Sequence, residues 1–564
     1  MRSVERVSHF SWHELPKRRA LSLELYIQKE RPSNSKKVWP IIRSYLSMAG
    51  LRVTVVDRRK VVGGAAVTQE FHPGFRNSVA AYTVSLLHPK IIRDLHLHEH
   101  GLRIVARRAQ NFLPTLDGRY LLAKEGETER QIAKFSRGDA ARHAEFSREL
   151  EASADQLRDL VLRAPPNLTE GLNPRGLGEL VKAAALGNRL RRLPAERLRT
   201  LFDLFTKSAG DYLDGWFEGD LVKALFGFDS IVGTYASPYT PGTAYVLLHH
   251  AFGEVNGQRR LWGHAVGGMG AITQAMAKTA ASHGVEIETD APVREVMVER
   301  DCASGVVLAD GRVVRGRIVA ANVNPKLLYT SMIASSTLDA AFLHRMRRWR
   351  CGSGTFRMNL ALSALPSFTA LPGAAVADHH TAGIILAPSL PHMDRAYDDA
   401  RRDGWSREPI IEMLIPSTLD DTLAPPGAHV ASLFCQHVAP ELPDGRSWHA
   451  CKDRVADHMI ETVERYAPGF KASIVGRQAL SPLDLEEIFG LTGGDIFHGA
   501  LSLDQLFWAR PMLGYADYRS PLKGLYHCGS GAHPGGGVTG APGHNAARAI
   551  LADRRWNLGR RLRS

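Results

Sequence analysis

Cysteine is scarce in this sequence of 564 residues. The five cysteines are widely scattered, and no two stand in a Cys-x-x-Cys arrangement; they are Cys302, Cys351, Cys435, Cys451 and Cys528. This scarcity excludes a thiol-based redox pair and a zinc knuckle, and it is typical of a protein from a reducing compartment. Any redox chemistry would therefore have to be carried by a bound cofactor.

Long hydrophobic runs are absent as well. No uninterrupted apolar run reaches the roughly 18 residues that a membrane-spanning helix needs, so the sequence predicts no membrane span. Residues 1–40 also lack the apolar core of a secretory signal, about 7–15 residues long, and Glu5, Glu14, Glu24 and Glu30 lie among their basic residues. This composition argues against a secretory signal and a transit peptide, and it predicts a cytoplasmic protein.

Acidic residues are outnumbered by basic ones, which gives a formal net charge of +13. Such an excess could attract nucleic acid or an anionic membrane surface. No basic cluster accompanies a nucleic-acid-binding motif or an aromatic series, so we expect no nucleic-acid partner. We expect solvated basic faces first and peripheral contact with a membrane surface second. The clusters are Arg189, Arg191, Arg192, Arg197 and Arg199; Arg345, Arg347, Arg348 and Arg350; and Arg554, Arg555, Arg560, Arg561 and Arg563.

The histidines show no pattern of metal ligands. Two adjacent pairs occur, His249 with His250 and His379 with His380. Adjacent side chains point to opposite faces of a strand or around a helix, so neither pair is expected to share a metal ion. The sequence therefore predicts no metal site.

Glycine is plentiful near the C-terminus, in residues 524–551. An apolar run over residues 525–528 leads into glycines and then into an alanine-rich run that suits a helix. This order predicts a strand, a glycine loop and a helix. Glycines let a backbone approach a ligand closely, and the amides at the start of a helix favour a negative group. The stretch therefore predicts a site for an anionic, flat-sided ligand.

This glycine-rich stretch resembles the C-terminal FAD signature of the phytoene desaturase-like flavoprotein oxidoreductases. Residues 53–68 resemble the same family's second N-terminal motif, in which an acidic residue, here Asp57, ends a strand and a glycine pair, here Gly63 and Gly64, follows. Residues 71–85 are similar to the subgroup called pyridine nucleotide-disulfide oxidoreductase domain-containing protein 2. The resemblance covers most of the chain but not residues 1–40, and it suggests the mitochondrial matrix as an alternative location.

The phosphate-binding turn of the family, Gly-x-Gly-x-x-Gly, is missing. In a Rossmann unit this turn stands about 20 residues before the acidic residue, which here falls on residues 30–37, where no glycine occurs. Leu21, Leu23, Leu25 and Ile27 alternate with polar residues, so a strand could form, although a central parallel strand is usually apolar throughout. We weigh two explanations. An altered early reading frame is favoured, because the similarity stops abruptly; the other is a diverged protein that binds FAD without this loop.

The expected fold is α/β, with a discontinuous Rossmann-like FAD-binding domain and a substrate domain of mixed sheet and helices. At 564 residues the chain is too long for one hydrophobic core. We assign residues 41–100, 262–325 and 495–553 to the FAD-binding domain, residues 101–261 and 326–494 to the substrate or cap domain, residues 1–40 to an atypical N-terminal segment and residues 554–564 to a basic tail. Asp310 and Gly311, between valine-rich runs, predict a hairpin.

The resemblance implies a set of FAD-binding residues. Asp57 would bind the adenosine ribose, the backbone of Val293 would pass the adenine, and the C-terminal loop would lie near the pyrophosphate and the flavin. The full set is Asp57, Gly63, Gly64, Val67, Val293, Gly529, Gly531, Gly536, Gly537 and Val538. No catalytic residue is assigned. His533 beside the flavin loop is a candidate, but a role in loop packing is favoured for it.

The implied function is FAD-dependent dehydrogenation of a lipophilic small-molecule substrate, with hydride passing to the flavin while the protein orients and desolvates the reactants. Two alternatives stay open. One is a catalytically impaired, flavoprotein-like scaffold, which the missing phosphate turn would explain. The other is a flavin amine oxidase, which shares the FAD fold.

Overall fold

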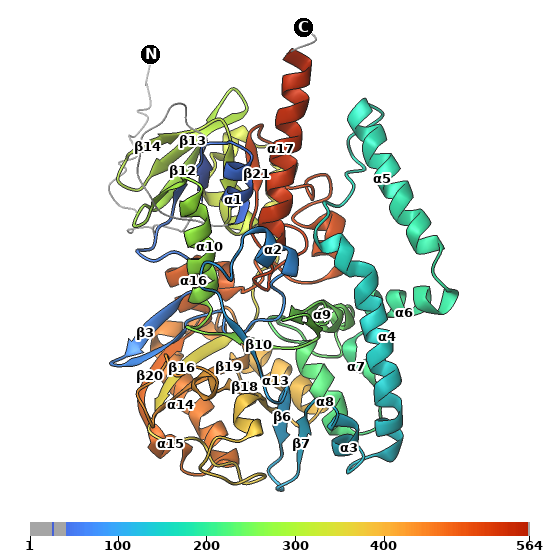
Figure 1. Ribbon diagram of the computed structural model, residues 1–564, viewed down its shortest axis with the longest axis vertical. Coiled ribbons are helices and arrows are strands. Elements are labelled where there is room, and N and C mark those ends of the chain that lie inside the picture. Colours follow the sequence, from blue (N-terminus) through green and yellow to red (C-terminus); the bar gives the residue numbers. More distant parts are fainter. Residues whose placement is uncertain (1–24, 28–40, 562–564) are drawn as a thin grey trace, which may run out of the picture.

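The computed structural model describes residues 25–27 and 41–561, and these form two units that lie one above the other in Figure 1. The upper unit is built on a five-stranded sheet and the lower unit on a seven-stranded sheet, each covered by helices. The predicted α/β fold is therefore confirmed. Among the described residues, no helix combines the length and the apolar character needed to cross a membrane.

The five-stranded sheet has the order β11-β2-β1-β15-β21. β11 pairs parallel to β2, and β15 pairs parallel to β21, as in a Rossmann-like sheet. β2 and β15 are short apolar runs that are largely buried, because both faces of the sheet are covered. The strands are β1 (Leu25–Ile27), β2 (Thr54–Val56), β11 (Glu286–Glu288), β15 (Val319–Ala321) and β21 (Leu525–His527).

The central strand, β1, runs against its neighbours. It pairs antiparallel with both β2 and β15, with Ile27 opposite Thr54 and Leu25 opposite Val56. The alternating pattern at residues 21–27 allows a strand, and residues 25–27 form one. It runs antiparallel to β2 and β15, whereas a Rossmann-like sheet would have it parallel. The chain after Ile27 therefore leaves at the edge of the sheet opposite Asp57. Residues 28–40, which include the glycine-free stretch at 30–37, and residues 1–24 lie outside the described residues.

Helices on one face of this sheet close its core. α1 (Ile41–Met48) packs against α17 (Ala541–Arg561) and α10 (Gly270–Ser282). Ile42 and Leu46, one turn apart on α1, meet Ala546 and Ile550 of α17. The predicted strand, loop and helix at the C-terminus are confirmed as β21 and α17, and the assigned basic tail begins inside α17.

The other face of the five-stranded sheet carries a small antiparallel sheet and two helices. The predicted hairpin at Asp310 and Gly311 is confirmed, with Gly311 at φ 88°. α11 and α12 follow residue 325, the boundary proposed from the sequence, yet Leu328 and Phe342 pack in one cluster with Val319 of the upper unit. These elements are β12 (Val293–Glu299), β13 (Cys302–Leu308), β14 (Val313–Arg315), α11 (Pro325–Ser331) and α12 (Ala340–Arg347).

The seven-stranded sheet of the lower unit has the order β20-β16-β19-β18-β17-β6-β7. Only the β17–β6 pair is parallel. Helix α14 (Trp448–Tyr466) presents Val455, Met459 and Val463, spaced four residues apart, to this sheet's core. The strands are β6 (Asn111–Pro114), β7 (Tyr120–Ala123), β16 (Phe356–Leu362), β17 (Gly383–Leu386), β18 (Trp405–Leu414), β19 (His429–Val438) and β20 (Ile474–Leu480).

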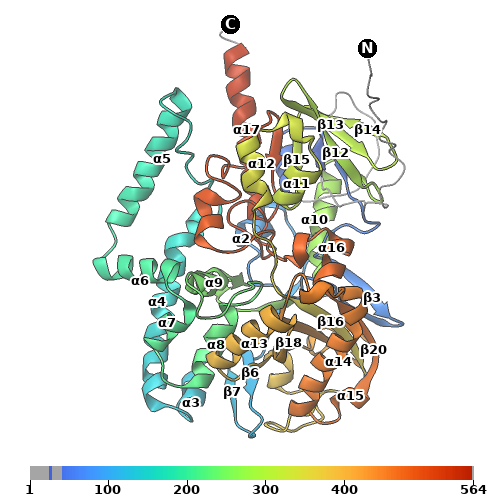
Figure 2. The same cartoon turned by 180° about the vertical axis from the view of Figure 1, so that it is seen from behind.

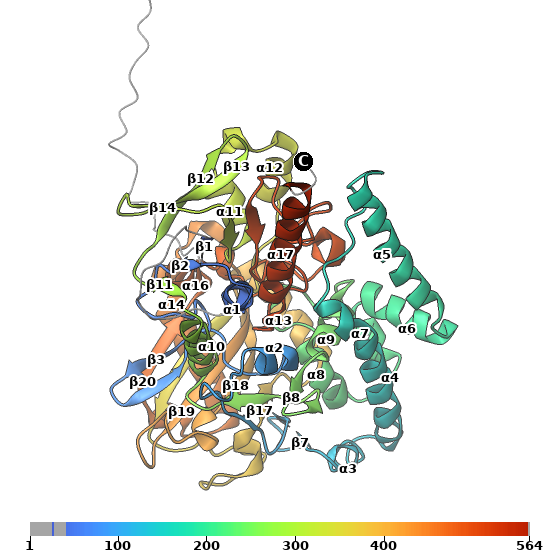
Figure 3. The same cartoon turned by 45° about the horizontal axis from the view of Figure 1, so that its top comes forward.

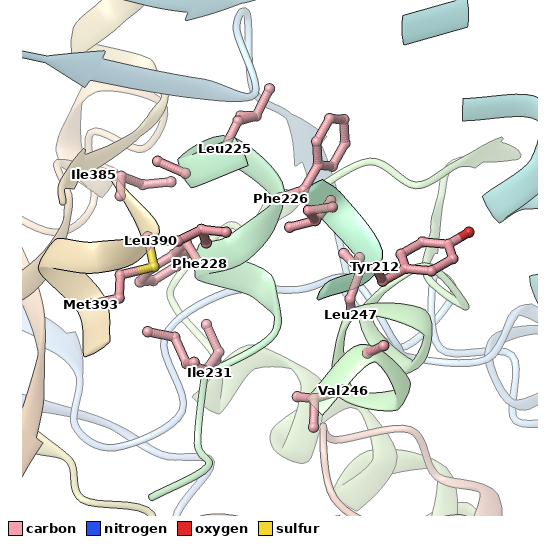
Figure 4. Packing of buried hydrophobic residues seen from close by; sticks show 14 of the residues in the cluster. Tyr212, Leu225, Phe226, Phe228, Ile231, Val246, Leu247, Ile385, Leu390 and Met393 are labelled. Carbon is pink, nitrogen blue, oxygen red and sulfur yellow. The ribbon is translucent and has the colours of Figure 1, made fainter. Parts of the chain in front are cut away.

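A helical part packs beside the lower sheet. In Figure 4, Leu390 and Met393 of α13 (Leu390–Asp403) point toward Phe228 of α8, and all three are buried. One helix, α5, stands away from the rest of the molecule in each view (Figures 1, 2 and 3). The helices of this part are α3 (Thr128–Ile132), α4 (Arg137–Val161), α5 (Pro174–Arg191), α6 (Ala195–Thr206), α7 (Ala209–Asp214), α8 (Asp220–Asp229) and α9 (Thr243–His250).

Shorter elements complete the fold. They are α2 (Pro89–Asp94), α15 (Phe470–Ser473), α16 (Pro482–Phe489), β3 (Thr68–His72), β4 (Phe75–Ser78), β5 (Ile104–Ala106), β8 (Glu254–Val255), β9 (Gln258–Arg259) and β10 (Gly263–Ala265). The 3-10 turns are at Ser335–Thr337, Asp378–Thr381, Pro416–Thr418, Pro443–Gly445, Thr492–Gly494, Leu503–Gln505 and Phe507–Ala509.

Candidate functional site

A cavity of about 310 Å³, called the main cavity below, lies where the two units meet. Its walls come from the turn after β2, residues 80–86, the first turns of α10, residues 489–498 and the glycine loop after β21. Five of the residues predicted to bind FAD line it: Gly63, Gly64, Gly529, Gly537 and Val538. The other five are not among its lining residues; they are Asp57, Val67, Val293, Gly531 and Gly536.

Asp57 ends β2 with a buried carboxylate that is only half satisfied. Its Oδ1 accepts a hydrogen bond from the amide of Arg59 at 2.8 Å, whereas Oδ2 has no partner in the described part of the chain. Burial raises the pKa of Asp57 to about 6, although the Arg59 hydrogen bond and the Arg59 and Arg58 charges oppose the rise. An unpaired buried carboxylate oxygen is costly, so the position fits a hydroxyl donor such as that of a sugar.

The glycine pair forms a tight turn after β2. Gly63 has φ +133°, and a Cβ there would lie 2.6 Å from the carbonyl oxygen of Ala66 and 2.7 Å from Val67. Gly64 has φ 52°, and its carbonyl accepts a hydrogen bond from Arg59 Nη1 at 2.9 Å. Only glycine suits Gly63, and Val67 lies fully buried beneath the turn.

The glycines of the C-terminal loop lie against protein atoms. A Cβ at Gly529 would be 2.5 Å from Asn322 Oδ1, at Gly531 2.2 Å from Pro325 Cδ, and at Gly536 2.4 Å from the Phe497 ring. Gly537 has φ +104° and would meet Leu86 at 2.4 Å. These glycines therefore allow the loop to pack against the protein. The sequence alone predicts that they allow the close approach of a ligand.

Val538 lines the main cavity in a strained conformation. Its φ is 56°, a region that β-branched residues rarely adopt. His498, on the opposite wall, also has a positive φ, 59°. Strained backbone of this kind concentrates at functional sites, because the surrounding structure must hold it in place.

Two helix N-termini reach the main cavity. Ile42, in the first turn of α1, and Pro542 and Gly543, in the first turn of α17, are among its lining residues. Thr539 Oγ1 accepts a hydrogen bond from the amide of Ala541 at 3.1 Å and caps the start of α17. Helix N-termini favour anions, so a pyrophosphate fits between them. The sequence predicts a helix from Ile41, but no motif marks the start of this helix as a binding site, because no glycine turn precedes it.

A buried arginine donates hydrogen bonds to two walls of the main cavity, the segment at residues 489–498 and the glycine loop. Arg510 donates to the carbonyl of Phe497 at 2.7 Å and to that of Ser530, in the glycine loop, at 2.9 Å. Burial lowers its pKa to about 10, partly offset by the Asp495 carboxylate. Asp495 in turn accepts from the amides of Phe497 and Gly499, each at 2.8 Å.

The far end of the main cavity is apolar and aromatic, with Tyr82, Val232, Trp262, Ile496 and Phe497 in its lining. No sequence signal marked these residues as a group, because they come from four separate segments. Tyr82 alone lies in the stretch, residues 71–85, that carries the subgroup resemblance.

Tyr82 is the polar group at this end. Its hydroxyl donates to Glu412 Oε2 at 2.5 Å, and the Arg357 guanidinium lies 4.3 Å from its ring centre. Glu412 is buried, with Arg107 Nη1 3.9 Å from its Oε1. Burial raises the pKa of Glu412, and the Arg107 charge opposes the rise. The arrangement can pass a proton from the cavity to the Glu412 carboxylate through the Tyr82 hydroxyl.

A second cavity, of about 750 Å³, meets the main cavity at His250 and Trp262, which line both. Their rings stack at 5.9 Å. Burial lowers the pKa of His250 to about 4, so the ring is neutral at pH 7. Asp229 lines the second cavity, and burial together with the Glu412 charge raises its pKa to about 7.

His533 lies outside the lining of the main cavity. Its Nε2 lies 2.9 Å from the carbonyl oxygen of Leu160, and its ring contacts Phe507. These contacts agree with a packing role. Val293 begins β12, buried in the cluster behind β15. Among the described residues, no group of three or more His, Cys, Asp or Glu side chains is arranged to hold a metal ion.

Comparisons with known proteins agree with this geometry. Residues 44–353 match the model of the flavin-containing amine oxidoreductases. The chain is 41% identical over 531 residues to pyridine nucleotide-disulfide oxidoreductase domain-containing protein 2 of Rattus norvegicus, with 91% of each chain covered. It is 24% identical over 538 residues to the neurosporene-forming phytoene desaturase of Cereibacter sphaeroides, covering 90% of this chain and 91% of that one.

Among solved structures, the crystal structure of an oxidoreductase from Methanosarcina mazei shares the fold. Its TM-score is 0.55 at 15% identity, with 91% of this chain and 97% of that chain covered. The predicted resemblance to the phytoene desaturase-like flavoproteins and to their subgroup is confirmed.

Proposed function

Because the chain belongs to the family of flavin-containing amine oxidoreductases, we propose that it dehydrogenates a lipophilic substrate in the main cavity. The chain is an FAD-dependent oxidoreductase. FAD, when bound, supplies the acceptor for a hydride from the substrate. The apolar, aromatic end of the main cavity carries this proposal, because it gives a reacting C–H bond a water-poor site beside the glycine loop.

The residues around the main cavity fit FAD in an extended arrangement. Asp57 Oδ2 would accept from the ribose, and the N-termini of α1 and α17 would face the pyrophosphate. Gly63, Gly64, Gly529, Gly537 and Val538 would line the cofactor's path. Val67, Gly531 and Gly536 would support the turn and the loop through packing. The resemblance also proposes that the backbone of Val293 contacts the adenine.

The apolar lining supports a lipophilic substrate, as does similarity to a protein named phytoene desaturase. Dehydrogenation removes a hydride and a proton. Tyr82 would take the proton at its hydroxyl oxygen while passing its own to the Glu412 carboxylate, 2.5 Å away. Trp262 and Phe497 would shield the reacting bond from water.

The proposal is tested first with the purified protein. It should be yellow or become so with added FAD, and a lipophilic polyene or terpene substrate should bleach the flavin absorbance without oxygen. Tyr82→Phe should bind the same substrate while slowing the bleaching. A protein that takes up no FAD would support the scaffold alternative and contradict the proposal.

A flavin amine oxidase is the second candidate function, and the description of the matching family favours it. The same anaerobic assay with primary and secondary amines distinguishes the two. Bleaching by amines but by no lipophilic hydrocarbon would replace the dehydrogenase proposal.

We also propose a cytoplasmic location, with the mitochondrial matrix as the alternative, supported by free cysteines at all five positions. Cell fractionation with compartment markers tests it.

A further inference from the structure

Helix α5 turns its charged side toward the protein. Glu179, Lys182 and Arg189 line a cavity of about 610 Å³ between α5 and α17. Arg189 Nη1 donates to Asp159 Oδ2 of α4 at 3.2 Å, and Glu179 Oε2 accepts from the amide of Asn167 at 3.0 Å. The polar contacts of α5 are thus made on its inner side.

The outer side of α5 is apolar and uncovered. Leu177, Leu180 and Val181 are 51%, 43% and 68% exposed, and they share one face because they are three, four or one residue apart. The only buried residue of α5 is Gly176. A helix on the surface of a globular protein normally shows the opposite arrangement, with its apolar face inward.

Exposed apolar side chains also occur on the neighbouring segments. Phe202 of α6 is 68% exposed, Leu198 is 37% exposed, and Leu172, just before α5, is 84% exposed. Together with Leu177, Leu180 and Val181, these residues are called the α5–α6 surface. Exposed apolar groups gathered in this way mark a docking site. Figure 1 shows α5 and α6 at one side of the molecule, where a flat partner could reach both.

The charges around this surface select its partner. From α5 through Lys207 the segment carries eight basic residues, including Arg191, Arg192 and Arg199, against three acidic ones. Five of the basic residues form ion pairs, which leaves three arginines and one acid outside these pairs, namely Arg191, Arg192, Arg199 and Glu196. A second copy of the chain would place two positive surfaces together, whereas anionic lipid offers both opposite charge and an apolar interior.

We propose that the α5–α6 surface docks onto an anionic membrane surface, with its six apolar side chains inserted among the lipids and its arginines at the headgroups. The docking is peripheral. It is independent of the enzymatic proposal, because no residue of the main cavity belongs to the α5–α6 surface.

Vesicle sedimentation tests this proposal with the full chain and without substrate. The wild-type protein should sediment with vesicles of phosphatidylcholine and phosphatidylserine, more weakly with phosphatidylcholine alone, and less as salt rises. Val181→Asp combined with Phe202→Asp should lower the partition coefficient by about tenfold or more, since two apolar side chains lose their burial in lipid. Arg191→Glu with Arg192→Glu should weaken binding to the anionic vesicles only.

The matched control combines Val313→Asp with Val475→Asp, since each of these valines is 49% exposed on a strand elsewhere. It should bind vesicles like the wild type. Circular dichroism and melting temperature confirm that each variant is folded. The proposal is overturned by wild-type protein that stays in solution with anionic vesicles, by equal loss in the control, or by a concentration-dependent dimer that Val181→Asp dissociates.

Discussion

At the scale of single residues, the glycines of the loop after β21 are required because they have no side chain. A Cβ at Gly529, Gly531, Gly536 or Gly537 would come within 2.6 Å of Asn322, Pro325, Phe497 or Leu86. The loop therefore lies directly on its neighbours, and Arg510 bonds to it from the other side. The positions proposed to bind flavin therefore also determine local packing.

Gly536→Val is expected to remove bound flavin and to lower stability as well. The valine Cβ would lie 2.4 Å from the Phe497 ring and 3.0 Å from its Cα, and overpacking of this kind costs about 1–3 kcal/mol. The sequence alone predicted loss of flavin without unfolding; the Phe497 contact adds the stability loss. Flavin absorbance and thermal melting measure the two effects.

Gly373→Ala is the control, because nothing lies within 4 Å of a Cβ at that position. It should leave both measurements unchanged. Wild-type flavin content and melting temperature in Gly536→Val would refute both the packing and the cofactor role of this loop.

Asp57 should make FAD binding depend on pH. Its pKa in the folded protein without FAD is about 6, above the ordinary value of 3.8, because burial disfavours the charge. The apoprotein should therefore lose about 3 kcal/mol of stability as pH rises from about 4 to about 6, at about 1.36 kcal/mol per pKa unit. A ribose hydroxyl that donates to the ionised carboxylate reverses this penalty, so FAD affinity should increase over the same interval.

Titration calorimetry at several pH values measures the effect. Asp57→Asn should bind FAD with little pH dependence, and Asp57→Ala should lose about 1–3 kcal/mol of binding. Equal pH dependence in Asp57→Asn and the wild type would assign the ribose contact to another residue.

Glu412→Gln should lower the pKa of Asp229. The Glu412 charge raises that pKa to about 7 together with burial, while Arg260 and Arg107 lower it, so removing the negative charge makes Asp229 easier to ionise. Infrared titration of the protonated carboxyl band, with Asp229→Asn to identify the signal, should show the shift. An unchanged midpoint would mean that Glu412 does not influence Asp229.

At the scale of elements, the reversed central strand decides how phosphate can be held. A Rossmann strand delivers the chain to a glycine turn at the edge where Asp57 lies, but β1 delivers it to the opposite edge. Without such a glycine turn, two or three backbone hydrogen bonds to a charged group, at about 1.5–3 kcal/mol each, would be lost, and we expect FAD binding to be weaker by roughly 3–9 kcal/mol. The N-termini of α1 and α17, which reach the main cavity, would then have to supply the phosphate contacts.

A graft tests this account. Residues 21–27 are replaced by an apolar strand parallel to β2, and residues 30–42 by a glycine-rich turn that leads into α1. FAD affinity should rise by several kcal/mol, measured by calorimetry. If the native chain already binds FAD tightly and the graft adds nothing, the idea of an altered reading frame is wrong.

Local sequence patterns predicted the elements whose structure is determined by nearby residues. The strand before the C-terminal glycine loop, the helix after it, and the hairpin at Asp310 all follow from turn chemistry and periodicity within about ten residues. The direction of β1 could not follow, because antiparallel pairing to β2 and β15 is decided by partners far away in sequence. The inward-facing charges of α5 could not be predicted either, because periodicity does not say which face of a helix contacts the protein.

At the scale of the whole molecule, the two units share one chain that crosses between them repeatedly. Asp57 and the glycine motifs could be found in advance because each is a short segment of fixed spacing. The aromatic end of the main cavity could not, because Tyr82, Val232, Trp262 and Phe497 meet only after both units have folded. The proposed flavin end and the proposed substrate end of the main cavity thus differ in how far they can be predicted from the sequence.

FAD should stabilise both units together, because the main cavity has walls from each. At a free FAD concentration of about 100 times the dissociation constant, binding adds about 2.7 kcal/mol to the free energy of unfolding. Calorimetry should show one transition that moves to higher temperature with FAD. Two transitions, of which FAD moves only one, would mean that a single unit holds the cofactor.

The position of β1 also bears on how the protein is synthesised. Ala321, the partner of Leu25 in β15, follows it 296 residues later in the chain, and β21 comes later still. At about 5–20 residues per second, a ribosome needs roughly 15–60 s to supply that partner. The central strand β1 can therefore pair with β15 only late in translation, and the two halves of the sheet can join only then.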